Sequence, residues 1–143
     1  MTTRRTGVDL CNCTTLRKAS RRVSQMYDAK LAASGLRTTQ FAILALLHEL
    51  EVLSVNELAG RLDLDRTTTG KNLRPLEEAG LIKIAASPQD RRSREAALTA
   101  KGRGALKIAA PLWQEAQREF EALNGRDNSA ELRATLEAIR VVD

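Results

Sequence analysis

Aromatic side chains are scarce in this sequence, which has one tryptophan, one tyrosine and two phenylalanines among 143 residues. Any core must therefore be built from leucine, alanine, isoleucine and valine, a composition that favours helices. Hydrophobic residues make up 43% of the chain and charged residues 29%, an ordinary globular balance that argues against wholesale disorder. The length fits one compact domain or one protomer of an intertwined oligomer.

Long apolar runs are also missing. The longest, Phe41–Leu47, is far shorter than the roughly 20 residues that a helix needs to cross a bilayer. The first segment, Met1–Gly7, carries Arg4 and Arg5, but no apolar stretch follows it, so the sequence predicts no signal peptide. These absences predict a cytoplasmic protein without a membrane partner.

Residues that commonly carry catalysis or bind metals are few. His48 is the single histidine, and the chain has no H-E-x-x-H motif, no glycine-rich phosphate loop and no G-x-S-x-G motif. Cys11 and Cys13 form a C-x-C pair, which supplies too few ligands for a metal site, and a reducing compartment disfavours a disulfide between them. The sequence thus predicts no enzyme, no metal and no cofactor. His48 is expected to end a buried helix, with an effector pocket as the alternative role.

The net charge of +5 is distributed unevenly along the chain. The segment from Arg66 to Arg94 has seven basic and three acidic residues, whereas the segment from Glu115 to Glu137 has six acidic and three basic residues. A protein that binds a polyanion concentrates its positive charge on one part of its surface. The middle of the chain is therefore the candidate surface for nucleic acid.

Hydrophobic periodicity predicts a series of helices separated by short breaks. Leu16, Val23 and Leu31 belong to an apolar stripe at helical spacing, and the run Phe41–Leu47 is apolar nearly all round, as in a buried helix. The helices are expected over Asn12–Ala33, from a cap at Thr38 or Thr39 past Leu47, over Val55–Leu62, from Asp65 to Ala79, from Thr99 to about Leu123, and over Ser129–Val141.

Two of these helices have the spacing of a helix-turn-helix. Ser54 and Glu57 match the capping box S-x-x-E, in which each side chain satisfies a free backbone N–H of the other residue. After a tight turn, Asp65 can cap the next helix, and Gly80 is the residue type expected just beyond its end. Two short helices joined in this way are typical of DNA-binding proteins.

A β-hairpin is predicted directly after the helix-turn-helix. Leu81–Ile84 and Ala96–Leu98 are expected as antiparallel strands joined by the polar loop Ser87–Arg94. A hairpin in this position is a wing. The predicted fold class is mainly α with a small β-wing, in a single domain over 1–143. Within it, residues 36–98 form the winged helix-turn-helix, and residues 12–33 and 99–141 form dimerisation helices.

One side of the predicted helix after Asp65 has the groups that contact DNA. At 100° per residue, Thr69, Leu73 and Leu76 fall on the interior side. Hydroxyl, amide and cationic side chains, which reach base edges and phosphates in the major groove, lie on the opposite side and its flanks. The predicted contacts are Arg66, Thr67, Thr68, Lys71, Asn72 and Arg74.

Three arginines, Arg91, Arg92 and Arg94, are predicted at the wing tip, where long side chains suit a narrow, electronegative minor groove. Asp90 is repelled by phosphate and is expected to orient a neighbouring arginine. The alternatives are an ordinary charged hairpin and a winged helix used for protein or RNA contacts. Duplex affinity that falls steeply with salt distinguishes DNA binding from the latter.

With these elements placed, the sequence resembles the MarR (multiple antibiotic resistance regulator) family over nearly its whole length. The strongest match runs from Leu62–Thr68 through Leu76–Ile82 and continues in the wing with Asp90–Arg94 and Leu98–Thr99. The resemblance implies a triangular homodimer with interlocked N- and C-terminal helices. It also implies binding to double-stranded, pseudo-palindromic operator DNA, as an effector-released repressor.

The resemblance carries over to single residues of the wing. It implies that Arg92 is the arginine that enters the minor groove and that Asp90 is its partner. Glu95 departs from the family pattern, in which an apolar residue usually begins the second wing strand.

The first and last helices carry apolar stripes that exceed what a small winged-helix core can cover, which predicts a homodimer. These residues are Leu16, Val23, Met26, Leu132, Leu136 and Ile139.

Cys13 provides a second comparison, because it stands 14 residues before Tyr27. This spacing is similar to that between the reactive cysteine and a hydrogen-bonding tyrosine in the organic-hydroperoxide-sensing branch of the family. Further tyrosines of that branch do not match, since Arg17 and Thr38 occupy their positions. A helix N-terminus and nearby cations favour a thiolate. Cys13 is therefore either an oxidant sensor or a small packing residue.

Overall fold

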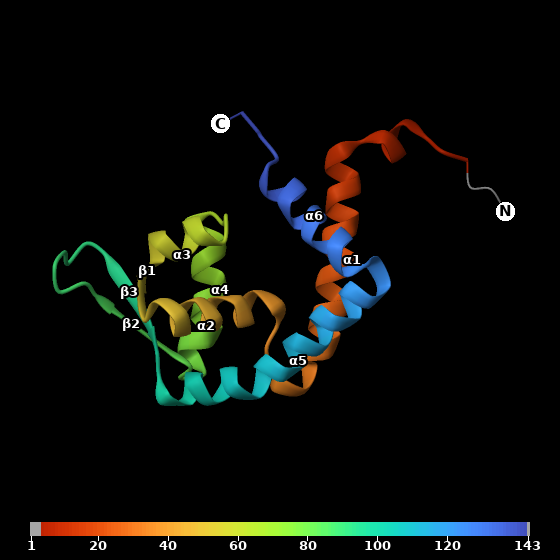
Figure 1. The fold of residues 1–143 in the computed structure, drawn as a ribbon. Coiled ribbons are helices and arrows are strands. Elements are labelled where there is room, and N and C mark those ends of the chain that lie inside the picture. Colours follow the sequence, from red (N-terminus) through yellow and green to blue (C-terminus); the bar gives the residue numbers. More distant parts are fainter. Residues whose placement is uncertain (1–3, 143) are drawn as a thin grey trace.

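The molecule consists of a winged-helix lobe and an arm of longer helices (Figure 1). The computed structural model describes residues 4–142. Met1–Thr3 and Asp143 lie outside the described residues. They belong to the predicted domain over 1–143, and Met1–Thr3 also belong to the segment Met1–Gly7. Helices predominate and a small antiparallel sheet forms the wing, so the predicted fold class is confirmed.

The arm is formed by α1 (Asn12–Leu31), α5 (Ala100–Asn124) and α6 (Arg126–Glu137). Short 3₁₀ turns at Gly7–Leu10 and Ala32–Ser34 flank α1. Helix α5 begins below the lobe and continues into the arm, where it lies along α1 and so joins the two parts (Figure 1).

Side-chain contacts hold α1 against α5 within the arm. The Lys30 ammonium lies 3.0 Å from the Glu119 carboxylate, and the Tyr27 hydroxyl donates a hydrogen bond to Gln117. The Lys30–Glu119 pair is partly exposed, so it contributes little stability by itself. The pKa of the Tyr27 phenol is raised above its ordinary value, and burial of the side chain is the largest cause.

The last helix differs from its prediction at both ends. It begins at Arg126 rather than Ser129 and ends at Glu137 rather than Val141. Ser129, the predicted first residue, is buried inside the helix, and its hydroxyl donates to the Gly125 carbonyl at 2.6 Å.

The lobe contains α2 (Thr38–Leu50), α3 (Val55–Arg61) and α4 (Arg66–Glu78). The capping box before α3 is confirmed, because the Glu57 N–H donates to the Ser54 hydroxyl at 3.0 Å and the Ser54 N–H donates to the Glu57 carboxylate at 2.7 Å. The predicted cap of α2 is wrong. Neither Thr38 nor Thr39 caps that helix with its side chain.

Helix α2 is capped in part by its own first turn, where the Gln40 side chain accepts the Arg37 N–H at 3.0 Å, and in part from another helix. The backbone N–H and the hydroxyl of Thr38 both donate to one carboxylate oxygen of Asp28, at 2.8 and 2.7 Å. Asp28 lies near the end of α1, so this contact fixes the angle at which the lobe leaves the arm.

The sheet has three strands, β1 (Val52–Ser54), β2 (Ile82–Ala86) and β3 (Arg94–Leu98), in the order β1-β3-β2. Both pairs are antiparallel, and Ala96 of β3 lies opposite Leu53 on one side and Ile84 on the other. The two wing strands were predicted, with ends that differ by a few residues. The strand β1 was missed, because three residues are too short for an alternating pattern to be visible.

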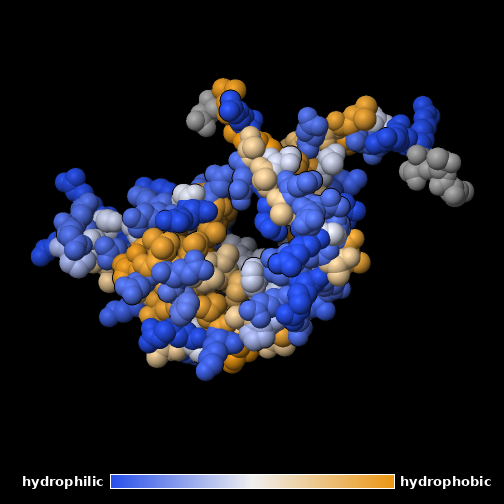
Figure 2. Space-filling view, in the orientation of Figure 1, coloured by the Kyte–Doolittle hydropathy of each residue, from blue (hydrophilic) through white to orange (hydrophobic). Residues whose placement is uncertain are grey.

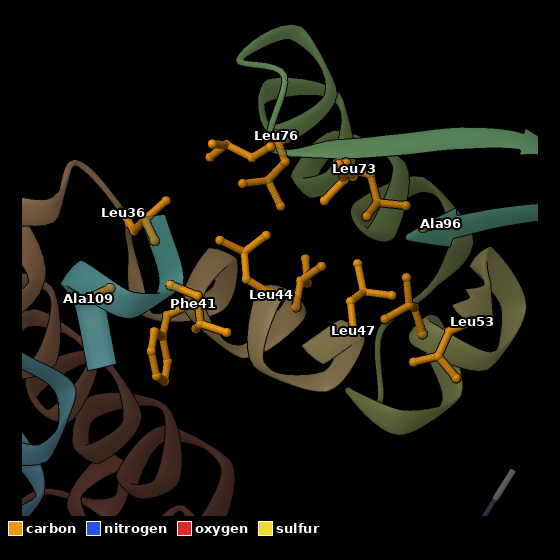
Figure 3. Close-up of a cluster of buried hydrophobic side chains, with 14 of the residues drawn as sticks. Leu36, Phe41, Leu44, Leu47, Leu53, Leu73, Leu76, Ala96 and Ala109 are labelled. Carbon is orange, nitrogen blue, oxygen red and sulfur yellow. The ribbon is translucent and has the colours of Figure 1, made fainter. Parts of the chain in front are cut away.

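Leucine side chains from α2, α3 and α4 meet in one core (Figure 3). Leu44 and Leu47 of α2 point toward Leu73 and Leu76 of α4, and all four are at most 2% exposed. Burial of one leucine side chain contributes about 1.5–3 kcal/mol, so these contacts hold α4 firmly on its apolar side. The polar side of α4 is thereby turned to solvent.

The start of α5 is packed tightly against the turn that follows α4. Thr99 caps α5 by accepting a hydrogen bond from the Gly102 N–H at 3.0 Å, and its own hydroxyl donates to the Gly80 carbonyl at 2.6 Å. A Cβ atom added at Gly102 would lie 1.9 Å from the carbonyl oxygen of Leu81. Only glycine lets the two backbones come so close.

Candidate nucleic-acid interface

The beginning of α4 is set by Asp65, as predicted. Its carboxylate accepts a hydrogen bond from the backbone N–H of Thr68 at 2.6 Å, in the geometry of an N-cap. The Thr68 backbone, and next the Thr68 hydroxyl, lower the pKa of Asp65 below its ordinary value. Asp65 is therefore ionised at neutral pH, and in this form it caps the first turn of α4.

The two sides of α4 differ as the periodicity predicts. Thr69, Leu73 and Leu76 are buried, and the Thr69 hydroxyl donates to the Asp65 carbonyl at 2.7 Å. Four of the predicted contact residues are exposed on the other side: Arg66, Thr67, Lys71 and Arg74. The structure thus brings three cations and a hydroxyl together on one surface of a single helix.

Two further predicted contacts, Thr68 and Asn72, are half-buried and already hydrogen-bonded. The Thr68 hydroxyl donates to Asp65 at 3.1 Å, and the Asn72 amide nitrogen donates to the Thr68 carbonyl at 3.0 Å. Both side chains keep an acceptor oxygen that a base amino group can use. Their orientation is fixed before any ligand arrives, which lowers the entropic cost of recognition.

The wing loop is held by backbone hydrogen bonds. The Ser87 N–H donates to the Ser93 carbonyl at 2.8 Å, and the Ser93 N–H donates to the Asp90 carbonyl at 3.0 Å. The Asp90 carboxylate accepts the backbone N–H of Arg92 at 3.0 Å. Asp90 was expected to orient an arginine side chain, but the contact it makes shapes the loop backbone instead.

The three wing arginines, Arg91, Arg92 and Arg94, are all exposed. The tip of the wing, at the left of the molecule, presents a hydrophilic surface (Figure 2). The guanidinium groups of the three arginines can therefore reach a ligand beyond the tip of the wing. Glu95, which departs from the family pattern, lies in β3 opposite Ala85 and Ser54, so the strand forms despite the charge.

The first helix separates Cys13 from Tyr27. Fourteen residues of continuous helix span about 21 Å, so these two side chains cannot touch within one chain. Cys13 is exposed and accepts a weak hydrogen bond from the Arg17 guanidinium at 3.9 Å. Tyr27 is buried and bonded to Gln117. The structure does not bring the predicted redox pair together in a single protomer.

Cys11 has a role that the sequence pattern did not reveal. It is the N-cap of α1, and its sulfur accepts the Thr14 N–H at 3.5 Å. Hydrogen bonds from the Thr14 hydroxyl and backbone lower the pKa of the exposed Cys11 thiol. Cysteine is unusual as a cap, which is why sequence reasoning did not find it.

His48 lies at the edge of a hollow of about 580 Å³ between α2 and α5. The rings of Phe41 and Trp113 stack there, with centroids 5.5 Å apart and planes inclined by 19°. Arg103 and Lys107 of α5 add two cations to the lining, and Glu49 of α2 adds one carboxylate. This hollow combines flat apolar surfaces with a net positive charge.

A second, largely apolar hollow of about 530 Å³ lies between α1, α5 and α6. Most of the predicted dimer stripe is found here: Leu16, Val23, Leu132 and Leu136 line it. Leu132 and Leu136 are 44% and 42% exposed, although both are large hydrophobic residues. Residues 4–142 thus leave an apolar surface of the arm uncovered.

Neither a membrane span nor a metal cluster is found between residues 4 and 142. None of the helices there combines the length and apolar character needed to cross a bilayer. In the same part of the chain, no three His, Cys, Asp or Glu side chains are grouped as metal ligands.

Comparison with known proteins gives consistent results. The sequence profile of the MarR family matches residues 36–93. The protein chain in the crystal structure of the M. tuberculosis transcriptional regulator MosR in complex with DNA is 40% identical in sequence to this chain. The match covers 92% of this chain and 99% of that one, with a TM-score of 0.76.

Two curated relatives match over shorter segments. The HTH-type transcriptional regulator TtmR of Methylorubrum extorquens (strain PA1) is 36% identical over 92 residues, which are 64% of this chain and 47% of that protein. The organic hydroperoxide resistance transcriptional regulator of Bacillus subtilis (strain 168) is 33% identical over 90 residues, 63% of this chain and 61% of that protein. The matches span about half and three fifths of these relatives. From the profile match and the near full-length similarity to a solved regulator, we conclude that the chain belongs to the MarR family of winged-helix transcriptional regulators.

Proposed function

We propose that this protein binds double-stranded operator DNA as a homodimer and represses transcription until a small effector releases it. The observation that carries the proposal is the exposed polar side of α4, which presents Arg66, Lys71 and Arg74 beside an arginine-tipped wing. A helix of this kind fits the major groove, and arginines at a wing tip fit the minor groove. The similar MosR structure, which contains DNA, supports the assignment. Catalysis has no part in the proposal.

Homodimerisation is supported by the uncovered hollow of the arm. Monomers rarely leave a contiguous apolar surface of this kind in water, and a second copy of the same helices can cover it. A two-fold dimer presents two α4 helices, so the operator should contain two half-sites about one helical turn, roughly 34–36 Å, apart.

The function is tested by selecting DNA fragments from the source genome with the purified protein and sequencing them. We expect fragments that share an inverted repeat, bound by two copies of the chain as measured by light scattering. Affinity for them should fall steeply as salt rises, because binding releases counterions from the phosphates. Fragments without a common motif, or a monomer that binds alone, would contradict the proposal.

The wing is tested at Arg92. We expect Arg92→Ala to weaken binding by about 10- to 100-fold at roughly 150 mM salt, because a hydrogen bond to a charged group contributes about 1.5–3 kcal/mol. Discrimination among bases in the major groove should stay the same, since the minor groove separates A·T from G·C but little else. Competition binding with operators mutated at single positions measures both effects. Arg92→Ala that binds as tightly as wild type would show that the wing does not enter the groove.

We propose the hollow between α2 and α5 as the effector site, with a planar aromatic anion as ligand. The stacked Phe41 and Trp113 rings offer flat contacts, and the two cations of Arg103 and Lys107 outnumber the one carboxylate of Glu49. Trp113 is the single tryptophan of the chain, so its fluorescence reports on the site directly.

We expect 2-naphthoate to change the Trp113 fluorescence saturably and to weaken operator binding over the same concentration range. The uncharged 2-naphthamide should bind less well, and Lys107→Ala should reduce the difference between the two compounds. Titration by fluorescence and by operator binding measures both. An unchanged fluorescence with every aromatic acid tried would exclude this hollow as the effector site.

A second candidate function is oxidant sensing through a thiol. It is favoured by the two exposed cysteines at the start of α1, and the similarity to the Bacillus subtilis organic hydroperoxide resistance regulator supports it. The sequence comparison points to Cys13, whereas the lowered pKa of Cys11 favours a thiolate at that residue. A thiolate that attacks an organic hydroperoxide becomes a sulfenic acid and releases the alkoxide, which takes up a proton to become the alcohol.

Operator binding before and after cumene hydroperoxide treatment tests this candidate in wild type, Cys11→Ser and Cys13→Ser. We expect the oxidant to release wild-type protein from DNA, and the serine variant of the sensing residue to stay bound. A coupling of about 1–3 kcal/mol between α1 and the DNA-binding surface is sufficient for release. Equal release in all three proteins, or in none, would leave both cysteines without a sensing role.

A further inference from the structure

The end of α4 is closed partly by its own backbone. The Gly80 N–H donates to the Glu77 carbonyl at 2.9 Å. The next N–H, that of Leu81, donates to the Leu76 carbonyl at 2.9 Å. These two bonds form a Schellman motif, in which Gly80 takes the left-handed conformation at φ +73°. The carbonyl groups of Ala79 and Gly80 follow, and both accept hydrogen bonds from α5 instead.

The contact from Lys101 combines charge and packing. Its ammonium donates to the Ala79 carbonyl at 2.8 Å, at the point where the end of α4 meets the start of α5 (Figure 1). Its alkyl stem lies over the turn, since a Cβ atom added at Gly80 would lie 3.9 Å from Lys101 Cδ. The C-terminus of a helix carries partial negative charge, which favours a cation there. Lys101 thus ties α4 to α5 from outside the core.

The core itself holds α4 over only part of its length. Thr69, Leu73 and Leu76 are buried and span about 10 Å, whereas the 13 residues of α4 span about 20 Å. The Asp65 cap at the start belongs to the first turn of α4, so it does not fix the direction of the helix relative to other elements. A contact from α5 does, because Leu106 anchors α5 in the same core as α4.

Pro75 increases the importance of support at the end of α4. It lies inside the helix, and proline has no N–H to donate to the Lys71 carbonyl. The last turn is therefore joined to the rest of α4 by one hydrogen bond fewer than in an uninterrupted helix. The bond from Lys101 to the Ala79 carbonyl holds this weakened end from another element.

We propose that Lys101 is a positioning residue for sequence recognition, which sets the angle of α4 by binding the Ala79 carbonyl. The inference rests on the proposed function, in which α4 enters the major groove. Side chains that read base edges must be held to within about 0.5 Å, whereas long cations that bind phosphates follow a small tilt of the helix. Lys101 therefore contributes to discrimination among sequences without touching DNA itself.

The test measures the affinity of Lys101→Met and wild type for the selected operator and for a random-sequence duplex, over a range of salt. Methionine removes the ammonium and keeps most of the stem. We expect operator affinity to fall about tenfold, as for one mismatched base pair, and random-duplex affinity to change little. Lys101→Arg should restore the preference for the operator, because a guanidinium also donates to a carbonyl.

Lys18→Met is the matched control, because it removes the same group from an exposed position of α1. It should leave both affinities unchanged. All variants are assayed well below their unfolding midpoints, so that a loss of stability alone does not change the ratio of the two affinities.

An unchanged ratio in Lys101→Met would overturn the positioning role. An equal loss on both duplexes, with a slope of log K against log salt that is shallower by about 0.9, would also overturn it and show that Lys101 binds a phosphate directly. Wild-type protein that binds the operator no better than the random duplex would instead contradict the proposed function itself.

Discussion

The double substitution Lys71→Ala and Arg74→Ala is expected to weaken DNA binding about 100-fold on every sequence. Both side chains are exposed on the polar side of α4, and neither takes part in the core. Two lost hydrogen bonds to phosphate, at about 1.5 kcal/mol or more each, give a loss of roughly 3 kcal/mol. The salt dependence should become shallower by about two phosphate equivalents. Fluorescence anisotropy with labelled duplexes measures both quantities.

A matched control removes the same charge from the arm. Arg21→Ala with Arg118→Ala also lowers the net charge by two, on exposed positions of α1 and α5. We expect this variant to retain most of its affinity, because its cations lie outside the α4 surface. If both double variants lost affinity equally, binding would depend on net charge alone, and the assigned docking surface would be wrong.

Gly102→Ala is expected to destabilise the protein by about 1–3 kcal/mol, the usual cost of inserting a methyl group into a packed site. The new Cβ would lie 1.9 Å from the Leu81 carbonyl oxygen and 3.1 Å from a methyl carbon of Leu98. The nearest atom belongs to the backbone, so no side-chain rotation can relieve the contact. The start of α5 must move away from the turn at Gly80, and this strains the Thr99 hydrogen bonds.

Gly104→Ala is the control within the same helix. It has no atom within 4 Å of an added Cβ, and alanine favours a helix over glycine by up to about 1 kcal/mol. We therefore expect opposite signs: Gly104→Ala should raise the midpoint of urea unfolding and Gly102→Ala should lower it, at one fixed protein concentration. Two changes of the same sign would show that α5 is not packed against Leu81 as described.

Much of the helix-turn-helix is predictable because its signals are local. The caps at Ser54, Asp65 and Thr99 each form a hydrogen bond to the residue three positions ahead, so residue type and spacing are enough to find them. The buried side of α4 follows from the 3.6-residue period for the same reason. These features belong to a single turn or a single helix.

Features that join distant segments were not predictable in this way. The Thr38 N–H at the start of α2 is capped by Asp28, ten residues away, and β1 exists only because β3 pairs with it. Two threonines next to the start of α2 looked like adequate caps, and nothing in the sequence indicated that a carboxylate of another helix would take their place.

The division between sequence and structure also runs through the proposed site. The amino-acid sequence by itself determined which side chains of α4 and of the wing point outward, because helix periodicity and hairpin turns are set by neighbouring residues. Only the tertiary structure decided that Lys101 binds the end of α4 and that Gly102 must be a glycine. These are contacts between elements, and their geometry depends on how the leucine core packs α2, α4 and α5 together, which no local pattern records.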